Sequence, residues 1–168
     1  MEKAKKETKA TSKKVTKAPK ERQESPVIDV LNQQVANFTV MYTKLHNYHW
    51  YVKGPNFFSL HVKFEELYTE VGQYLDMTAE RVLAINGHPV ATLKECLEQS
   101  IVKEAGKHLT AEEMVKDLSN DLQQLIEQLK EGQNTAEEAK DEMSADMILE
   151  MITQFEKHNW MLASYLGK

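Results

Sequence analysis

Three pairs of side chains that could bind metal, each an imidazole or a carboxylate, occur at helical spacings in the first half of the chain. They are His46 with His49, His61 with Glu65, and Asp76 with Glu80. Side chains three or four residues apart lie on one side of a helix, so each pair could offer two donor atoms to one metal ion. Each pair also has a plainer interpretation, as buried histidines bonded to backbone groups, a surface hydrogen bond or a solvated acidic face.

The spacing between the second and third pairs is more informative than either pair alone. At about 100° per residue, Asp76 is turned only about 60° from His61, so both pairs face one side of the helix. Fifteen residues separate them along the axis, which is roughly 22 Å at ~1.5 Å per residue. Bonds from a metal to nitrogen or oxygen are only about 2.0–2.2 Å long, so one straight helix cannot close a single site with both pairs.

Two copies of the chain would bring the pairs together if their helices packed antiparallel about a two-fold axis near Val71. The His61 pair of one copy would then lie level with the Asp76 pair of the other, giving two equivalent sites. His49, on the neighbouring helix, could complete each site. Imidazole and carboxylate without thiolate suit iron or manganese, and few protein ligands leave positions for an oxidant, so iron redox chemistry is the natural hypothesis.

Hydrophobic periodicity predicts the helices that would carry these residues. The first begins at Ser25-Pro26, an N-cap followed by the proline that suits the first helical turn, and ends at Gly54-Pro55. The second follows almost at once and ends at residues 86–89. Such a short connection joins antiparallel neighbours.

Three capping boxes divide the rest of the chain. Thr92 opens a short helix, Thr110 opens a third long helix that should end near Gly132, and Thr135 opens a fourth that should end near Gly167. Short first and third links with a long middle connection predict an all-α, ferritin-like four-helix bundle, with a short extra helix between helices two and three. An up-down-up-down bundle with a decorated loop is the alternative.

Charge is distributed unevenly along the 168 residues. Residues 1–22 carry eight Lys and Arg22 against three Glu, a net charge of +6. The whole chain carries −5, so the remaining residues carry −11. This segment has too few apolar side chains for a core, so we expect a disordered arm over residues 1–24 and one domain over residues 25–168. A solubilising tail is one role for the arm, and sequence-independent contact with DNA phosphates is the other. The candidate DNA-binding residues are Lys3, Lys5, Lys6, Lys9, Lys13, Lys14, Lys17, Lys20 and Arg22.

The composition argues against a membrane protein and against a secreted, disulfide-rich protein. No run approaches the ~18 apolar residues of a membrane span, and the N-terminal segment lacks the apolar core of a secretion signal. The lone Cys96 excludes an intramolecular disulfide framework and fits a reducing compartment. We therefore expect a cytoplasmic protein, associated with the nucleoid if the arm binds DNA.

Residues 46–55, 57–68 and 76–81 resemble the Dps family of mini-ferritins, also called DNA-protection-during-starvation proteins. The resemblance extends from about Val27 to Gly167. It implies a twelve-subunit shell that binds iron at ferroxidase sites shared across two-fold interfaces, two per interface. The shell would oxidise Fe(II) preferentially with hydrogen peroxide and store ferric mineral inside. Twelve basic arms on one shell would strengthen a weak contact with DNA.

The resemblance also assigns roles to individual residues. His49, His61, Asp76 and Glu80 match the family's ferroxidase ligands, with His46 close enough to tune them. Glu65 departs from the pattern, because many relatives have Asp there, so the longer side chain would coordinate directly or hold a water-bridged ion.

Two further roles follow from the same resemblance. Trp50 matches a tryptophan that donates an electron and traps radicals beside the site, and a core aromatic at a helix interface is the alternative. Near the predicted start of the fourth helix, three acidic residues repeat every four positions in a region that lines three-fold pores in the family. A solvated face is the alternative to a pore that draws cations inward. These residues are Glu138, Glu142 and Asp146.

The sequence thus predicts an enzyme, a ferroxidase that also stores iron. None of the six histidines follows a glutamate by three positions, which argues against the intrasubunit di-iron sites of larger ferritins. Two alternatives stay open: a shell that chiefly compacts DNA and has a vestigial metal site, and a helical interaction bundle without metal.

Overall fold

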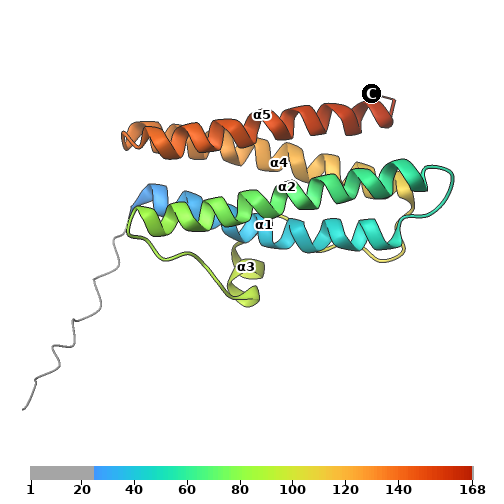
Figure 1. Ribbon diagram of the computed structural model, residues 1–168, viewed down its shortest axis with the longest axis horizontal. Helices are drawn as coiled ribbons and strands as arrows, with labels where there is room; N and C mark the ends of the chain where they lie inside the picture. The colour runs from blue at the N-terminus through green and yellow to red at the C-terminus, as the bar shows by residue number, and fades with distance from the viewer. Residues whose placement is uncertain (1–24, 168) are drawn as a thin grey trace, which may run out of the picture.

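The computed structural model describes residues 25–167 as a bundle of long helices with one short helix outside it (Figure 1). In chain order the helices are α1 (Pro26–Tyr51), α2 (Phe57–Ala84), α3 (Leu93–Gln99), α4 (Ala111–Glu138) and α5 (Glu142–Tyr165). No strand occurs among these residues. The all-α prediction is confirmed, including the short extra helix between the second and third long helices.

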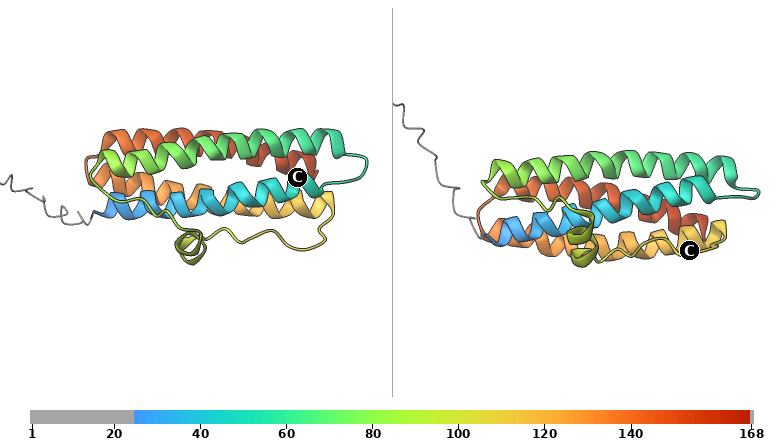
Figure 2. Two further views of the ribbon diagram at one scale, coloured as in Figure 1. Left: turned by 60° about the horizontal axis from the view of Figure 1, so that its bottom comes forward. Right: turned by 90° about the horizontal axis from the view of Figure 1, so that it is seen from below.

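The connections decide the topology of the bundle. Residues 52–56 link α1 to α2, and residues 139–141 link α4 to α5, so each of these pairs is antiparallel. Residues 85–110 instead run back along the length of the bundle, with α3 on the way (Figure 2). Helices α2 and α4 therefore point the same way. This confirms the crossover of a ferritin-like bundle and rules out the up-down-up-down alternative.

Local signals explain where most of the helices begin. Pro26 occupies the first turn of α1, where its missing N–H has no cost. The Thr92 side chain accepts a hydrogen bond from the backbone N–H of Glu95 at the start of α3. Thr110 and Glu113 form a complete capping box at the start of α4. Each signal acts within one helical turn, which is why the sequence alone predicted these starts.

The second half of α4 corrects a predicted boundary. The helix continues through Gly132 and Thr135 to Glu138, and the Thr135 hydroxyl donates to the carbonyl oxygen of Glu131 (3.0 Å) instead of capping a new helix. Gly132 is buried where α4 packs on α1, and a Cβ there would lie 2.6 Å from a methyl carbon of Val30. This glycine therefore permits close packing and does not end the helix.

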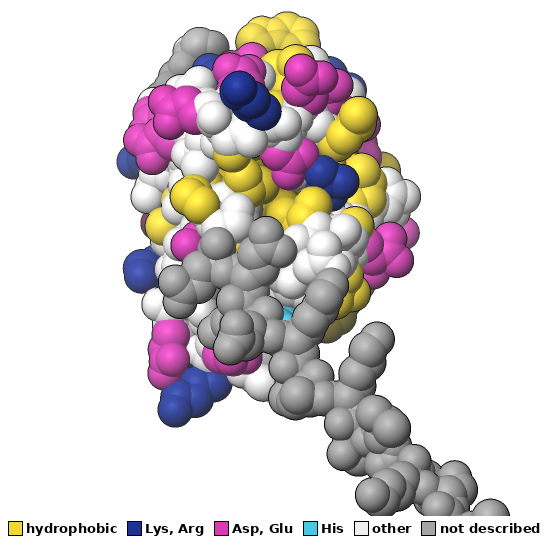
Figure 3. Space-filling model, turned by 90° about the vertical axis from the view of Figure 1, so that its left-hand side faces the viewer, with side chains coloured by type: hydrophobic (Ala, Val, Ile, Leu, Met, Phe, Trp, Pro, Cys, Tyr) yellow, Lys and Arg dark blue, Asp and Glu magenta, His cyan; other side chains and the backbone are white. Residues whose placement is uncertain are grey.

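The acidic residues that were predicted to share one helix lie on two. Helix α5 begins only after Asp141, whose carboxylate accepts a hydrogen bond from the backbone N–H of Ser144 (3.1 Å). Glu138 is the last residue of α4, whereas Glu142 and Asp146 belong to the first turns of α5. All three are exposed, and acidic side chains gather with hydrophobic ones at this end of the bundle, which Figure 3 faces. The prediction that all three lie on one helix was wrong, because the turn between α4 and α5 separates Glu138 from the other two. Their role in a pore stays a prediction.

The core is built from the apolar faces of the four long helices. Phe38 of α1, Phe64 of α2, Leu122 of α4 and Phe155 of α5 are all buried. The rings of Phe38 and Phe155 meet edge to face, with centroids 5.9 Å apart. Removing this apolar surface from water is the main stabilising term. The closely packed core holds the helices, and the polar side chains on them, in fixed positions.

The predicted arm over residues 1–24, with all its basic side chains, lies outside the described residues. Within residues 25–167, none of the helices combines the length and the apolar character that crossing a bilayer requires. Cys96 is buried and is not part of a disulfide.

Candidate metal centre

The first two donor pairs meet where the α1–α2 hairpin turns. Helix α1 ends at Tyr51, and Gly54 adopts a positive φ of 98°, a left-handed conformation that favours glycine. Helix α2 starts at Phe57, so the last turn of α1 lies against the first turns of α2. This hairpin places His49 beside His61 although 12 residues separate them in the sequence.

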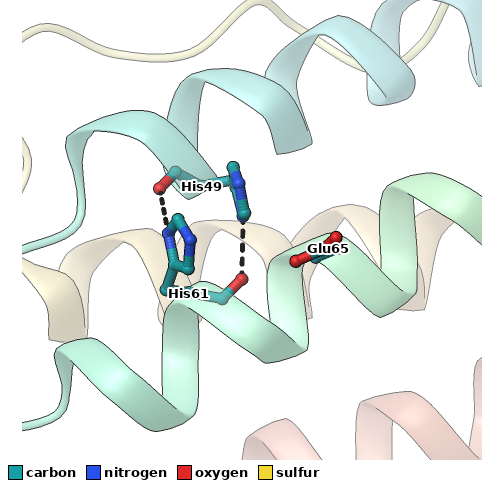
Figure 4. A group of neighbouring side chains, drawn as sticks. All are labelled: His49, His61 and Glu65. Carbon is teal, nitrogen blue, oxygen red and sulfur yellow. Dashed lines mark hydrogen bonds between the residues drawn. The ribbon is translucent and has the colours of Figure 1, made fainter.

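His49 and His61 exchange hydrogen bonds between their side chains and their backbones (Figure 4). Nδ1 of His49 lies 2.8 Å from the carbonyl oxygen of His61, and Nδ1 of His61 lies 2.9 Å from the carbonyl oxygen of His49. A carbonyl oxygen only accepts, so each Nδ1 carries a proton and each neutral ring keeps its lone pair on Nε2. The rings stack, with centroids 3.7 Å apart. Both imidazoles are thereby held in a tautomer that can bind metal.

Glu65 adds a carboxylate to the two imidazoles. It lies one helical turn beyond His61 on α2, and the candidate ligand atoms of His49, His61 and Glu65 all lie within 4.8 Å of one another. Glu65 is exposed, so the cluster opens to the surface. Two nitrogens and one oxygen suit a divalent first-row metal and leave coordination positions for other ligands. The structure thus brings these three predicted ligands together.

The third predicted pair lies elsewhere on α2. Asp76 and Glu80 are exposed, and Asp76 follows His61 by 15 residues, or roughly 22 Å along the helix. A shallow groove beside α2 extends from Tyr68 past Gly72 to Asp76. One chain therefore presents two separate half-sets of ligands. Their union across an interface between two copies stays a prediction.

An aromatic cluster borders the candidate metal centre. His46 stacks on Tyr68 with ring centroids 3.9 Å apart, and Tyr68 meets His49 edge to face at 5.3 Å. Nδ1 of His46 lies 2.9 Å from the carbonyl oxygen of Tyr42, and the Trp50 ring lies 5.3 Å from that of His46. His46 therefore lies beside the three-residue cluster and outside it. Trp50 is 68% exposed in the chain, so it is not a core aromatic of the single subunit.

Tyr68 had no role in the predictions made from the sequence. It follows His61 by seven residues, or two helical turns, so the spacing already placed both on one side of α2. Partial burial, and then the negative charge of Glu65, raise the pKa of the Tyr68 hydroxyl. Tyr68 and Glu65 therefore lie close together on one side of α2.

Known proteins share this fold over most of the chain. Residues 28–168 match the ferritin-like domain. General stress protein 20U of Bacillus subtilis is 56% identical over 141 residues, which cover 84% of this chain and 97% of that protein. DNA protection during starvation protein 2 of Bacillus anthracis is 53% identical over 142 residues, which cover 84% of this chain and 97% of that protein. The crystal structure of Dps from Staphylococcus aureus is 62% identical, covers 83% of this chain and 94% of its own, and superimposes with a TM-score of 0.83. The chain therefore belongs to the Dps family of ferritin-like proteins.

Proposed function

We propose that this protein is a ferroxidase that oxidises Fe(II) with hydrogen peroxide and stores the ferric product inside a shell of twelve copies. The observation that carries the proposal is the reciprocal hydrogen bonding of His49 and His61, which occupies both Nδ1 atoms and leaves both Nε2 lone pairs to bind metal in the cluster with Glu65. Iron accepts such a mixture of imidazole and carboxylate ligands. Membership of the Dps family supports the same function.

Iron is the substrate, and each residue has a simple task. His49 and His61 bind Fe(II) through Nε2, and Glu65 balances its charge directly or through a bridging water. Asp76 and Glu80 of a second copy supply further oxygens, so two ions can be held close together. Each Fe(II) gives one electron to hydrogen peroxide, the O–O bond breaks, and two protons complete two water molecules.

The proposal needs two copies because one chain holds its ligands in two separate places, around His61 and around Asp76. Antiparallel pairing of α2 about a two-fold axis near Val71 would join them and create two sites per interface. Large apolar side chains are exposed on α2 in the single chain, which supports burial of this helix against another copy. They are Phe58, Val62, Met77 and Leu83.

A subunit-mixing experiment tests the shared site. His61→Ala and Asp76→Ala chains are produced separately and together, and the mixed shells are isolated through two different affinity tags. Each variant alone should oxidise iron slowly, because every site lacks one ligand. With random pairing, half of the interfaces are mixed and each of those regains one intact site, so about a quarter of the wild-type sites should return.

The same experiment has a matched control. Glu66→Ala removes an exposed carboxylate of α2 that pairs with Lys63 and lies outside the ligand cluster, so it should oxidise iron at the wild-type rate. Mixed shells that are no more active than the two single variants would refute a site shared between subunits.

We also propose that the basic arm over residues 1–24 binds DNA without sequence preference. Its Lys-rich composition and the name of the Bacillus anthracis relative support this activity. A chain without residues 1–22 should no longer retard DNA in gels at low salt, and it should still oxidise iron. Retained DNA binding would refute the role of the arm.

DNA compaction by a wild-type protein that oxidises no iron would instead favour a DNA-compacting shell with a vestigial metal site. Binding to DNA would place the protein in the cytoplasm with the nucleoid.

Two further roles complete the proposal. Trp50, exposed beside His46, would trap radicals that escape the centre. Glu138, Glu142 and Asp146 would draw Fe(II) toward a pore on a three-fold axis. Replacing these three acids with their amides should slow iron uptake at low ionic strength more than at high ionic strength, because salt screens exposed charges.

A further inference from the structure

Tyr68 contacts one ligand of the candidate metal centre and the histidine beside that centre. Its ring stacks on His46 at 3.9 Å and meets the ring of His49 edge to face at 5.3 Å. Glu65, the carboxylate of this centre, precedes Tyr68 by three residues on α2, so the two side chains lie on one side of the helix. Tyr68 therefore touches the ligand cluster through its ring, and the carboxylate of the same cluster can accept its hydroxyl proton.

We propose that Tyr68 is an electron donor, which supplies the second electron when peroxide meets a centre that holds only one Fe(II). This role rests on the proposed iron oxidation and adds one residue to it. Peroxide takes two electrons when it is reduced to water, and a single Fe(II) gives only one. Without a second donor, cleavage of the O–O bond would release a hydroxyl radical.

The step balances with a single tyrosine. Fe(II) and Tyr68 lose one electron each, and the O–O bond of peroxide breaks. The products are Fe(III), a neutral tyrosyl radical and two water molecules. Formation of the two waters consumes two protons, one from the Tyr68 hydroxyl by way of Glu65 and one from solvent.

Ring contacts favour Tyr68 over Trp50 as the first donor. Among residues 25–167, the aromatic contact of Trp50 is with His46 alone, at 5.3 Å. In the chain, the Tyr68 ring contacts the ligand His49 directly, whereas the Trp50 ring contacts His46, which lies outside the three-residue cluster. Electron transfer weakens steeply with distance, so the nearer ring should be oxidised first. Trp50 is then the second donor.

Freeze-quench electron paramagnetic resonance tests this order. The full-length protein is loaded with one Fe(II) per site without oxygen, mixed with hydrogen peroxide and frozen within milliseconds. A parallel sample contains ring-deuterated tyrosine, which narrows the signal of a tyrosyl radical and leaves a tryptophan radical unchanged. The variants are Tyr68→Phe, Trp50→Phe and Tyr51→Phe. Phenylalanine keeps the ring and its packing, and Tyr51 is an exposed tyrosine outside the aromatic cluster.

The wild type, Trp50→Phe and Tyr51→Phe should all give an early radical whose signal narrows on deuteration. Tyr68→Phe should lose this signal and release more hydroxyl radical to a spin trap, while it still oxidises iron when two Fe(II) are bound per site. The role of Tyr68 is overturned if Tyr68→Phe keeps the signal, or if the wild type oxidises iron with no deuterium-sensitive radical. A wild type that oxidises no iron would refute the proposed function, and the role of Tyr68 with it.

Discussion

Removal of one buried charge should show how α1 is held against α4. The Lys44 ammonium lies 2.5 Å from a carboxylate oxygen of Asp117 and 2.5 Å from one of Asp121. The side chains of Lys44, Asp121 and Asp117 are 1%, 10% and 42% exposed. Lys44→Met keeps most of the aliphatic volume and removes the charge. Asp117 can then be hydrated, and it still accepts the hydrogen bond from Tyr48, whereas Asp121 is left buried without a cation.

The size of the effect follows from the cost of keeping Asp121 neutral. Burial raises the pKa of Asp121, while the hydrogen bond and the charge of Lys44 lower it, so the folded variant should carry a protonated Asp121. Protonating a group with an ordinary pKa of about 3.9 at pH 7 costs about 1.36 kcal/mol for each of about three pH units, or about 4 kcal/mol. Breaking a buried ion pair by removing one partner typically costs about 3–5 kcal/mol, which agrees.

The loss of stability should shrink as the pH falls. The folded variant binds a proton on Asp121 that the unfolded chain releases above its ordinary pKa, so the stability of the variant declines as the pH rises. At pH 5 the same arithmetic leaves a penalty of about 1.5 kcal/mol.

Unfolding in guanidinium chloride, followed by circular dichroism at pH 5 and pH 7 and at one subunit concentration, measures both penalties. Adding Asp121→Leu to Lys44→Met removes the stranded carboxyl and should restore most of the stability. Lys130→Met removes an exposed lysine that pairs with Glu156, and this control should change the free energy of unfolding by less than about 1 kcal/mol. A loss below about 1 kcal/mol for Lys44→Met at pH 7, or a loss of equal size at pH 5, would refute the reasoning.

Three further predictions concern helix ends and contacts between helices. Asp141→Ala removes the N-cap of α5 and should lower the free energy of unfolding by about 1–2 kcal/mol, so an unchanged Tm would contradict the capping role. The hydrogen bond from His158, against the opposing effect of burial, lowers the pKa of Glu70. The stability this brings should be present above the ordinary glutamate pKa and be lost as the pH falls through the lowered folded pKa. Glu70→Gln should weaken the fall in the free energy of unfolding at acid pH. A fall as steep as in the wild type would contradict this role of Glu70. Gly132→Ala should cost about 1–3 kcal/mol in chemical denaturation because its methyl group meets Val30, whereas a gain in stability would show that this contact yields easily.

The sequence by itself determined the number of helices, most of their starts and the spacing of the donor pairs. Pro26, Thr92 and Thr110 marked helix starts because capping involves atoms within one turn. The rise per residue of a helix is constant, so the separation of His61 and Asp76 followed from counting alone. That count is enough to show that one chain cannot close a site with both pairs.

Only the tertiary structure decided which atoms meet between helices. The capping signal at Thr135 was overridden: the helix continues through Gly132, where α4 packs closely on Val30, and the Thr135 hydroxyl bonds within the helix to Glu131. The tautomers of His49 and His61 depend on backbone carbonyls that the hairpin places opposite each ring.

Lys44 and Asp121 illustrate the same limit over a longer range. They are 77 residues apart and lie on α1 and α4, so no spacing along either helix could pair them. Periodicity shows which face of a helix is buried. The depth at which two buried faces meet, and the side chains that then touch, depend on how the complete set of helices packs.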